Sequence, residues 1–232
     1  MSPYLTLNAG GPVTDVESRY LDGKWQMLAE QLRIPTAVAD ALLTALKQSM
    51  AEQHRAYHTL GHVLDLLRES DKHAMSDADR MQLELAIWYH DAVYDVFAQN
   101  NEHLSAVMAT DQMRSYLTPE ATQCLFDDIM STAHHTDPRP DYPAQLLLDL
   151  DLAVFAAEPL TYKMYTQRVR EEYRAVPDIM FNRGRMHALQ QYLDREYIYH
   201  TPHFRECYEE AARLNVGAEL RELSDTVTSM AA

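Results

Sequence analysis

The sequence is poor in glycine, cysteine and basic residues, and it contains no long hydrophobic run. Only 6 of its 232 residues are glycine, whereas hydrophobic residues make up 47%. That hydrophobic content is typical of a globular chain and argues against disorder. Because the tight turns of sheet proteins depend on glycine, while the abundant alanine, leucine, methionine, glutamine and glutamate form helices well, the composition predicts an all-α fold.

The lack of a long hydrophobic run and the scarcity of cysteine bear on where in the cell the protein is found. No stretch approaches the roughly 20 uncharged apolar residues that a membrane-spanning helix needs. The N-terminal residues form neither the basic nor the apolar part of a signal peptide. The two cysteines, Cys124 and Cys207, lie in separate helical patterns without a CxxC partner. The sequence therefore predicts a cytoplasmic protein in which neither thiol is a nucleophile or a ligand.

The scarcity of basic residues limits the partners. There are 20 lysines and arginines against 35 aspartates and glutamates, for a formal net charge of −15. Such a chain repels a polyanion, so we expect no nucleic acid polymer as partner. The lack of a long apolar stretch argues against a membrane as partner. A small phosphorylated substrate is compatible with this charge, because a metal ion and a few basic side chains reverse the field inside a cleft. Both a monomer and a homodimer are open.

The pattern of caps and breakers predicts one helical domain. We expect a disordered tail over residues 1–13, a single domain over residues 14–223 and a flexible tail over residues 224–232. Thr14 and Glu17 have the spacing of a capping box. Further helix starts are expected at Thr36, Ser76, Thr118 and Thr201, the last two with proline at the first helical position. Loops are expected at 94–101 and 137–143, and a short helix at 186–195.

Two apolar segments contain acidic residues that burial would make costly. The segment AIWYHDAVYD contains His90 and Asp91, and LLLDLDLAVF contains Asp149 and Asp151. A carboxylate in such a helix needs a partner, and a divalent metal ion is a natural one.

A third segment, YHTLGH, places His58 and His62 four residues apart. Residues at this spacing project from one face of a helix, which suits either two metal ligands or one ligand beside a proton donor.

The ordered set of His, His-Asp and distant Asp resembles the HD superfamily of metal-dependent phosphohydrolases. Together with NNEHLSA, NRGR and EEAARLNVGAEL, these motifs are similar to those of a bacterial subfamily of predicted HD phosphohydrolases over about residues 15–223. The resemblance implies an HD-type helical bundle, with the metal site within 55–155 and a C-terminal helical extension over 160–223. It also implies a divalent ion bound by His62, His90, Asp91 and Asp151.

The resemblance suggests roles for four further residues and leaves alternatives open. It favours Asp151 over Asp149, whose alternative role is to cap a helix or support a ligand. YHTLGH is similar to the Y-H-N-x-x-H motif of cyclic-nucleotide phosphodiesterases, which would make His58 the general acid, or else a support for a ligand. Glu102 and His135 are candidates for binding a second ion or orienting water, although Glu102 also suits a helix start.

Two departures separate the chain from better-known relatives. Tyr94 replaces a glutamate of the HDTVED motif of guanosine tetraphosphate hydrolases, and Thr59 replaces the asparagine of the phosphodiesterase motif.

The densest basic cluster lies in the C-terminal third of the chain. Arginine binds phosphate well through its planar fork of donors, which suggests a substrate-binding role for this cluster. The alternative is ordinary salt bridging, as for Arg168 and Glu172, which are four residues apart. The cluster consists of Lys163, Arg168, Arg170, Arg183 and Arg185.

The sequence thus predicts a metal-dependent phosphohydrolase that cleaves a phosphoester of a small metabolite or nucleotide with metal-activated water. His58, Asp91 and Glu102 would be catalytic. Manganese, iron, cobalt, magnesium and zinc all suit histidine and carboxylate ligands. Two alternatives remain, an HD-fold di-iron oxygenase and a non-catalytic sensor or interaction module stabilised by the metal.

Overall fold

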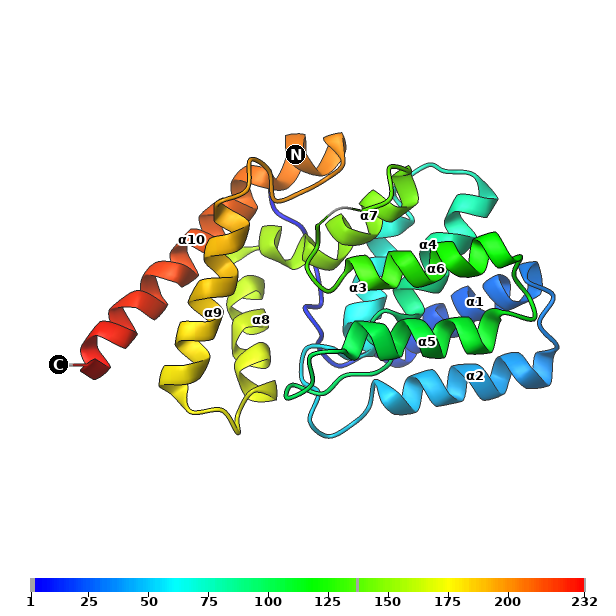
Figure 1. The fold of residues 1–232 in the computed structure, drawn as a ribbon, viewed down its shortest axis with the longest axis horizontal. Helices are drawn as coiled ribbons and strands as arrows, with labels where there is room; N and C mark the ends of the chain where they lie inside the picture. Colours follow the sequence, from blue (N-terminus) through cyan, green and yellow to red (C-terminus); the bar gives the residue numbers. More distant parts are fainter. Residues whose placement is uncertain (1–2, 137, 232) are drawn as a thin grey trace.

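The computed structural model describes residues 3–136 and 138–231, and the all-α prediction is confirmed (Figure 1). In chain order the elements are α1 (Asp15–Gln31), α2 (Thr36–Ser49), α3 (Leu60–Ser70), α4 (Asp77–Tyr89), α5 (Asn101–Met113), α6 (Pro119–Ser131), α7 (Tyr142–Asp151), the short 3-10 helix η1 (Leu152–Ala156), α8 (Pro159–Glu172), α9 (Asp178–Leu193) and α10 (Pro202–Ala231).

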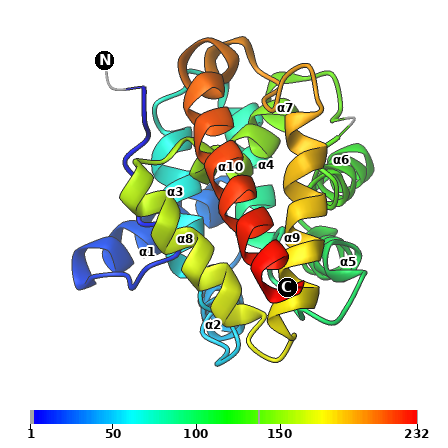
Figure 2. The ribbon, with the colours of Figure 1, turned by 90° about the vertical axis from the view of Figure 1, so that its left-hand side faces the viewer.

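Helices α1–α7 form one lobe, and α8–α10 form a second lobe beside it (Figure 1). In the first lobe α5 packs against α6, and α4 packs against α7. In the second lobe α9 packs along α10, and all three helices of that lobe lie on the face seen in Figure 2. The short helix η1 contacts both α8 and α10. The two lobes are therefore joined through the segment that directly follows Asp151.

Helix α4 forms the centre of the first lobe. Every residue from Leu83 to Tyr89 is buried, as expected of a helix that neighbours cover on all sides. Trp88 packs edge-on against Trp25 of α1, with ring centroids 5.5 Å apart, and the Trp25 indole N–H donates to the carbonyl of Ala39 in α2. This packing fixes the end of α4, and with it the position of His90.

Several helix starts follow the sequence prediction. Thr14 and Glu17 form the predicted capping box. Ser76 caps α4 and Thr118 caps α6 through their side-chain oxygens. Thr36 was expected to cap α2, and this is wrong. Pro35 occupies the cap position without a side-chain bond, and Thr36 is the first residue of the helix.

The expected disordered tail is wrong for residues 5–11. Leu5 and Ala9 are buried, and Leu5 exchanges backbone hydrogen bonds with Ala156 and Glu158 at the start of the second lobe. The Asp65 carboxylate accepts the backbone N–H groups of Asn8 and Ala9, each at 2.7 Å. The segment is ordered because a buried carboxylate of α3 needs donors. Residues 1–2 lie outside the described part of the chain.

The C-terminal predictions also need correction. Helix α10 continues through residues 224–231, which we expected to be flexible. The hydroxyls of Thr226 and Thr228 bond to carbonyls one turn earlier, as they do in a continuous helix. Helix α9 begins at Asp178, directly after Pro177, and is longer than the short helix expected at 186–195. Among the described helices, none combines the length and apolarity needed to cross a membrane.

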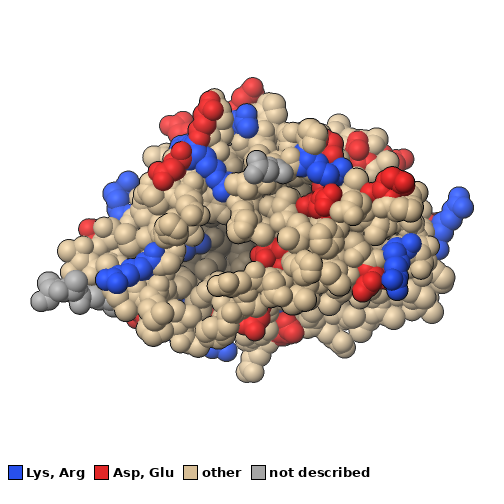
Figure 3. Space-filling model, viewed as in Figure 1, with Lys and Arg blue, Asp and Glu red and all other residues tan. Residues whose placement is uncertain are grey.

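A cleft of about 790 Å³ lies where the lobes meet. Its lining comes from the segment before and at the start of α5, the end of α6, η1, and one face each of α8 and α9. The hollow is visible near the middle of the face in Figure 3, between α9 and the ends of α5 and α6.

Candidate metal centre

His62 lies in the first turn of α3, and the start of this helix is fixed by close backbone packing. Thr59 caps the helix by accepting the Gly61 N–H, and its hydroxyl donates to the carbonyl of Gly10. A Cβ atom on Gly61 would lie 2.2 Å from the Gly11 carbonyl oxygen. Only glycine allows this approach, so the N-terminal segment and Gly61 together set the position of His62.

His90 ends α4 and is 1% exposed. Its Nδ1 lies 3.0 Å from the Ile87 carbonyl oxygen. Since a carbonyl only accepts, Nδ1 carries a hydrogen, so in the neutral form of the ring Nε2 is the nitrogen that is free to bind a metal ion. A backbone carbonyl often plays this role behind a metal-binding histidine.

Donor atoms converge around these two imidazoles. The Nε2 atoms of His62 and His90 lie 3.1 Å apart. Asp151 Oδ1 lies 3.1 Å from His62 Nε2 and 3.6 Å from His90 Nε2. Adjacent ligands about 2.1 Å from a common ion lie about 3.0–3.4 Å apart for octahedral and tetrahedral angles. His62, His90 and Asp151 therefore form a group that could hold a metal ion, with ligand atoms all within 4.8 Å of one another.

Asp91 lies at the edge of this group. Its Oδ2 is 3.2 Å from His90 Nε2 and 3.7 Å from His62 Nε2. It does not belong to the compact group of three, although it faces the same pair of imidazole nitrogens.

Asp149 and Asp151 have different surroundings. Asp149 is fully buried and accepts the backbone N–H groups of His200 and Thr201 and the Thr201 hydroxyl. Burial raises its pKa to about 6 although these hydrogen bonds oppose the shift. Asp149 therefore holds the start of α10, which is the capping alternative, and Asp151 is the carboxylate that reaches the metal group.

His135 adjoins the group through Asp151. Its Nε2 lies 2.8 Å from Asp151 Oδ2, and its Nδ1 lies 3.2 Å from the Tyr192 hydroxyl. The backbone of His135 has φ +50°, a left-handed conformation that is uncommon outside glycine. Arg195 holds this turn by donating to the carbonyls of His134 and His135. The second lobe thus fixes the orientation of His135.

Glu172 is a site residue that the sequence analysis missed. Its Oε1 accepts the backbone N–H groups of Ala56, Tyr57 and His58 at 2.8–2.9 Å. Its Oε2 lies 2.8 Å from His58 Nδ1 and accepts the Tyr94 hydroxyl. The available signal was its spacing, because it follows Val169 by three residues and so belongs to the buried face of α8.

This contact shifts both ionisation equilibria. Burial lowers the pKa of His58, but the charges of Glu172 and Asp91 outweigh burial and leave that pKa above its ordinary value. Burial raises the pKa of Glu172, but the His58 charge and the hydrogen bonds lower it to about 2. His58 and Glu172 form an ion pair at the wall of the cleft.

The metal group shows the same competition. Burial lowers the pKa of His62, and the neighbouring Asp151 offsets this only in part. Burial also opposes the charged form of His90, but Asp91 and Asp151 raise its pKa well above the ordinary range. Both carboxyl pKa values are held low by the histidines despite burial. Such mutual shifts are typical of functional sites.

Arg55 is a second residue that the sequence analysis missed. Its guanidinium is buried and donates to the backbone carbonyls of His58, Asp91 and Ala92. It thereby links the segment before α3 to the segment after α4. Its Nε also donates to the carboxylate of Glu52, three residues earlier. No sequence pattern predicts the link between the two segments, because the acceptors that make the link are backbone atoms.

The structure does not bring the predicted basic cluster to the cleft. Lys163 and Arg183 are exposed. Arg168 donates to the carbonyls of Asn8 and Ala9 and does not pair with Glu172. Arg170 binds Asp178 and the carbonyls at the end of α8.

Among the cluster only Arg185 lines the cleft. It makes a two-pronged ion pair with Glu219 of α10 and donates to the Tyr165 hydroxyl. Glu102 also lines the cleft, from the first turn of α5. The two cysteines lie outside the cleft, with Cys124 accepting a hydrogen bond from Arg139.

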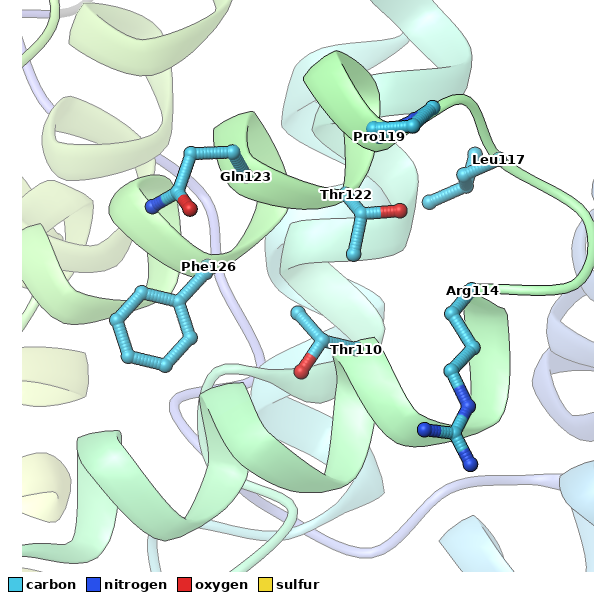
Figure 4. Close-up of a pocket in the computed structure, with 7 residues that line it drawn as sticks. All are labelled: Thr110, Arg114, Leu117, Pro119, Thr122, Gln123 and Phe126. Atoms are coloured by element: carbon cyan, nitrogen blue, oxygen red, sulfur yellow. The ribbon is translucent and has the colours of Figure 1, made fainter.

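A second depression, of about 420 Å³, lies between α5 and α6 (Figure 4). Arg114 is its only charged lining residue, and the others are Thr110, Leu117, Pro119, Thr122, Gln123 and Phe126. It contains neither histidine nor carboxylate, so it offers no metal site.

Comparisons with models of protein families, with curated proteins and with solved structures find no match for this chain.

Proposed function

We propose that the protein is a metal-dependent phosphohydrolase of HD type, which cleaves a phosphoester of a small molecule with metal-activated water. The observation that carries this proposal is the facing pair of imidazole nitrogens, 3.1 Å apart, with Asp91 and Asp151 beside them at the base of a cleft. Without an ion, a proton joins the two nitrogens at that distance, and a divalent cation between them would replace this proton and take both nitrogens as ligands.

His62, His90 and Asp151 would hold the ion, with Asp91 as the fourth ligand. Imidazole and carboxylate together suit manganese, iron, cobalt, magnesium or zinc. A divalent ion held there supplies a Lewis acid for the phosphoryl oxygens and lowers the pKa of water.

His58 would protonate the departing oxygen. Its Nδ1 faces the Glu172 carboxylate, so Nδ1 donates there and Nε2 is left to deliver a proton. The raised pKa of His58 keeps it protonated to higher pH than an ordinary histidine, as a general acid requires. Glu172 is fixed by three backbone N–H groups, and this holds the imidazole in one orientation.

The remaining polar residues suit the handling of water. Asp91 is the carboxylate at the edge of the metal group, where it can accept a proton from an attacking water. Glu102 lines the cleft from the N-terminal turn of α5. His135 orients the second oxygen of Asp151.

The test is to strip the protein of metal, reload it with each candidate ion and measure release of phosphate or alcohol from a panel of phosphoesters. We expect activity only with metal, and a loss of about 10²–10⁴-fold in kcat for His58→Ala. His187→Ala is the matched control, because His187 is exposed on α9, does not line the cleft and hydrogen-bonds to Gln191 on the same helix.

The same experiment separates the alternatives. Consumption of oxygen by an iron-loaded protein, without phosphoester cleavage, would favour the oxygenase. Tight metal binding without turnover of any substrate, together with unchanged behaviour of His58→Ala, would favour a sensor or interaction module.

A further inference from the structure

We infer that the cleft selects phosphoesters in which a single phosphate group is attached, directly or through one sugar, to a planar ring system, and that it disfavours polyphosphates and phosphates of polyols without such a ring. This inference rests on the proposed function of the metal centre and names the class of substrate. It follows from the charges, the apolar wall and the ring contacts of the cleft.

The charges exclude a chain of phosphates. Among the lining residues, Arg185 is the only lysine or arginine, and Glu219 and Tyr165 already engage it. The N-terminus of α5 also reaches the cleft, but the carboxylate of Glu102 is in its first turn. A second or third phosphate would therefore meet no free lysine or arginine among the lining residues, whereas proteins that bind such groups supply these side chains for them.

An ion at the metal group offers positive charge for one phosphate only. Two charges of the ion would balance Asp91 and Asp151, and Glu102 has no ion pair among the described residues. Each additional phosphate would enter a region whose electrostatic potential is already negative. A low dielectric constant in the cleft increases the energy of this repulsion.

Part of the cleft lining is apolar. Leu152, Val154 and Phe155 contribute from η1, and Val169 and Ala188 contribute from α8 and α9. The hydroxyls of a sugar phosphate would lose water against this wall without gaining hydrogen bonds. A flat ring buries its faces there without such a loss.

Five aromatic rings, each in contact with the next, continue this wall. Tyr57 packs against Tyr165 with centroids 4.7 Å apart, Tyr165 against Phe155 at 6.3 Å, Phe155 against Tyr192 at 5.1 Å, and Tyr192 against His135 at 6.1 Å. All five residues line the cleft. The edge-on contacts between these rings fix their orientations, so the wall is rigid before a substrate arrives.

This wall joins the metal group directly. His135, at one end of the series, contacts Asp151, and Tyr57, at the other end, packs against His62 with centroids 4.9 Å apart. A ring on the wall therefore lies next to a phosphate at the metal group. The cleft volume of about 790 Å³ is within the usual range for a small-molecule site and accommodates such a compound.

The test measures binding separately from turnover. Metal-loaded His58→Ala protein is titrated with four probes, a nucleoside monophosphate, an aryl phosphate, a pentose phosphate and a nucleoside triphosphate. Mn²⁺ is kept in excess so that the triphosphate cannot strip the site. We expect at least one ring monophosphate to bind about tenfold or more tightly than the pentose phosphate and the triphosphate.

The first two probes distinguish the sources of the ring. Preference for the nucleotide indicates a nucleoside, and equal or better binding of the aryl phosphate indicates a simple aromatic ester. Equal binding of the pentose phosphate, or tighter binding of the triphosphate, overturns the inference.

Tyr192 provides a second measurement. In Tyr192→Leu the ratio of affinities for the ring monophosphate and for inorganic phosphate should fall several-fold, while Tyr192→Phe should keep the ratio. An unchanged ratio in Tyr192→Leu contradicts the inference. Ring-selective binding without hydrolysis would refute the proposed function alone, and hydrolysis without ring selectivity would refute this inference alone.

Discussion

His58 and Glu172 are 114 residues apart in the sequence, and their side chains meet at 2.8 Å. His58 belongs to the segment before α3, and Glu172 is the last residue of α8 in the second lobe. The Glu172 carboxylate also collects three backbone N–H groups from residues 56–58. The second lobe thus contributes to the candidate site, because it supplies the carboxylate that holds the imidazole of His58.

Replacing Glu172 by glutamine should lower kcat by about 10- to 100-fold and change its pH dependence. Burial lowers the pKa of His58, and the Glu172 charge is the largest effect that opposes burial. Without that charge the pKa of His58 falls. As the pH rises, His58 in the variant therefore loses its proton, and the protein its activity, at a lower pH than in the parent.

A kcat–pH profile of both proteins measures this shift. Glu171→Gln is the matched control, since Glu171 is exposed and contacts Arg174. If kcat declines on the alkaline side of the profile at the same pH in Glu172→Gln as in the parent, Glu172 has only a structural role.

Glu172 should also make stability depend on pH. Its pKa is about 2 in the folded protein and 4.5 ordinarily, so the unfolded chain binds more protons between these values. The resulting stabilisation is present above pH 4.5 and is lost as the pH falls toward 2, by an amount on the order of 3 kcal/mol. Urea unfolding at pH 5.5 and pH 3.0 should show a smaller loss for Glu172→Gln than for the parent. Equal losses would contradict the low pKa.

Gly61→Ala should destabilise the protein and weaken metal binding together. The new Cβ would lie 2.2 Å from the Gly11 carbonyl oxygen, so the backbone before His62 must move. We expect a loss of about 2–4 kcal/mol in the free energy of unfolding and a weaker metal affinity.

Gly184→Ala is the control, because nothing lies within 4 Å of its Cβ position in α9. It should stabilise the protein by about 0.5–1 kcal/mol. Denaturant unfolding with and without metal measures the stability of both variants. An unchanged free energy of unfolding in Gly61→Ala would show that the N-terminal segment shifts at little cost to make room for the new Cβ atom.

Arg55→Lys should weaken metal binding more than it weakens the fold. The guanidinium donates to three carbonyls, at residues 58, 91 and 92. A lysine ammonium is a single small group and cannot reach all three carbonyl oxygens at once. We expect about a tenfold or greater loss of metal affinity by competition with a chelator. Arg174→Lys, at an exposed ion pair, should change nothing. Unaltered affinity in Arg55→Lys would limit Arg55 to a role in folding.

Local patterns in the sequence predict local structure well in this chain. The capping box at Thr14 and Glu17 and the caps at Ser76 and Thr118 depend on side chains within three residues of the atoms that they bind. The metal group was also predictable in part, because polar residues in apolar helices need partners. Its members His62, His90 and Asp151 come together as expected.

Long-range contacts to the backbone were not predictable in the same way. Most hydrogen bonds of Arg55 and Glu172 are to backbone carbonyls and N–H groups, which nearly every residue carries. The side-chain contact of Glu172 with His58 spans 114 residues, so no local pattern marks it. The N-terminal segment has no periodicity of its own and is ordered by Asp65. The basic cluster failed as a guide to phosphate binding because intramolecular acceptors use most of its arginines.

Crystals of the metal-loaded protein can be measured by anomalous scattering to locate the ion. If His62, His90 and Asp151 bind it, one strong peak will lie within bonding distance of the two Nε2 atoms and of Asp151, and it will disappear in His62→Ala. A peak at another place in the chain, or one that survives this substitution unchanged, would show that these residues do not form the metal site.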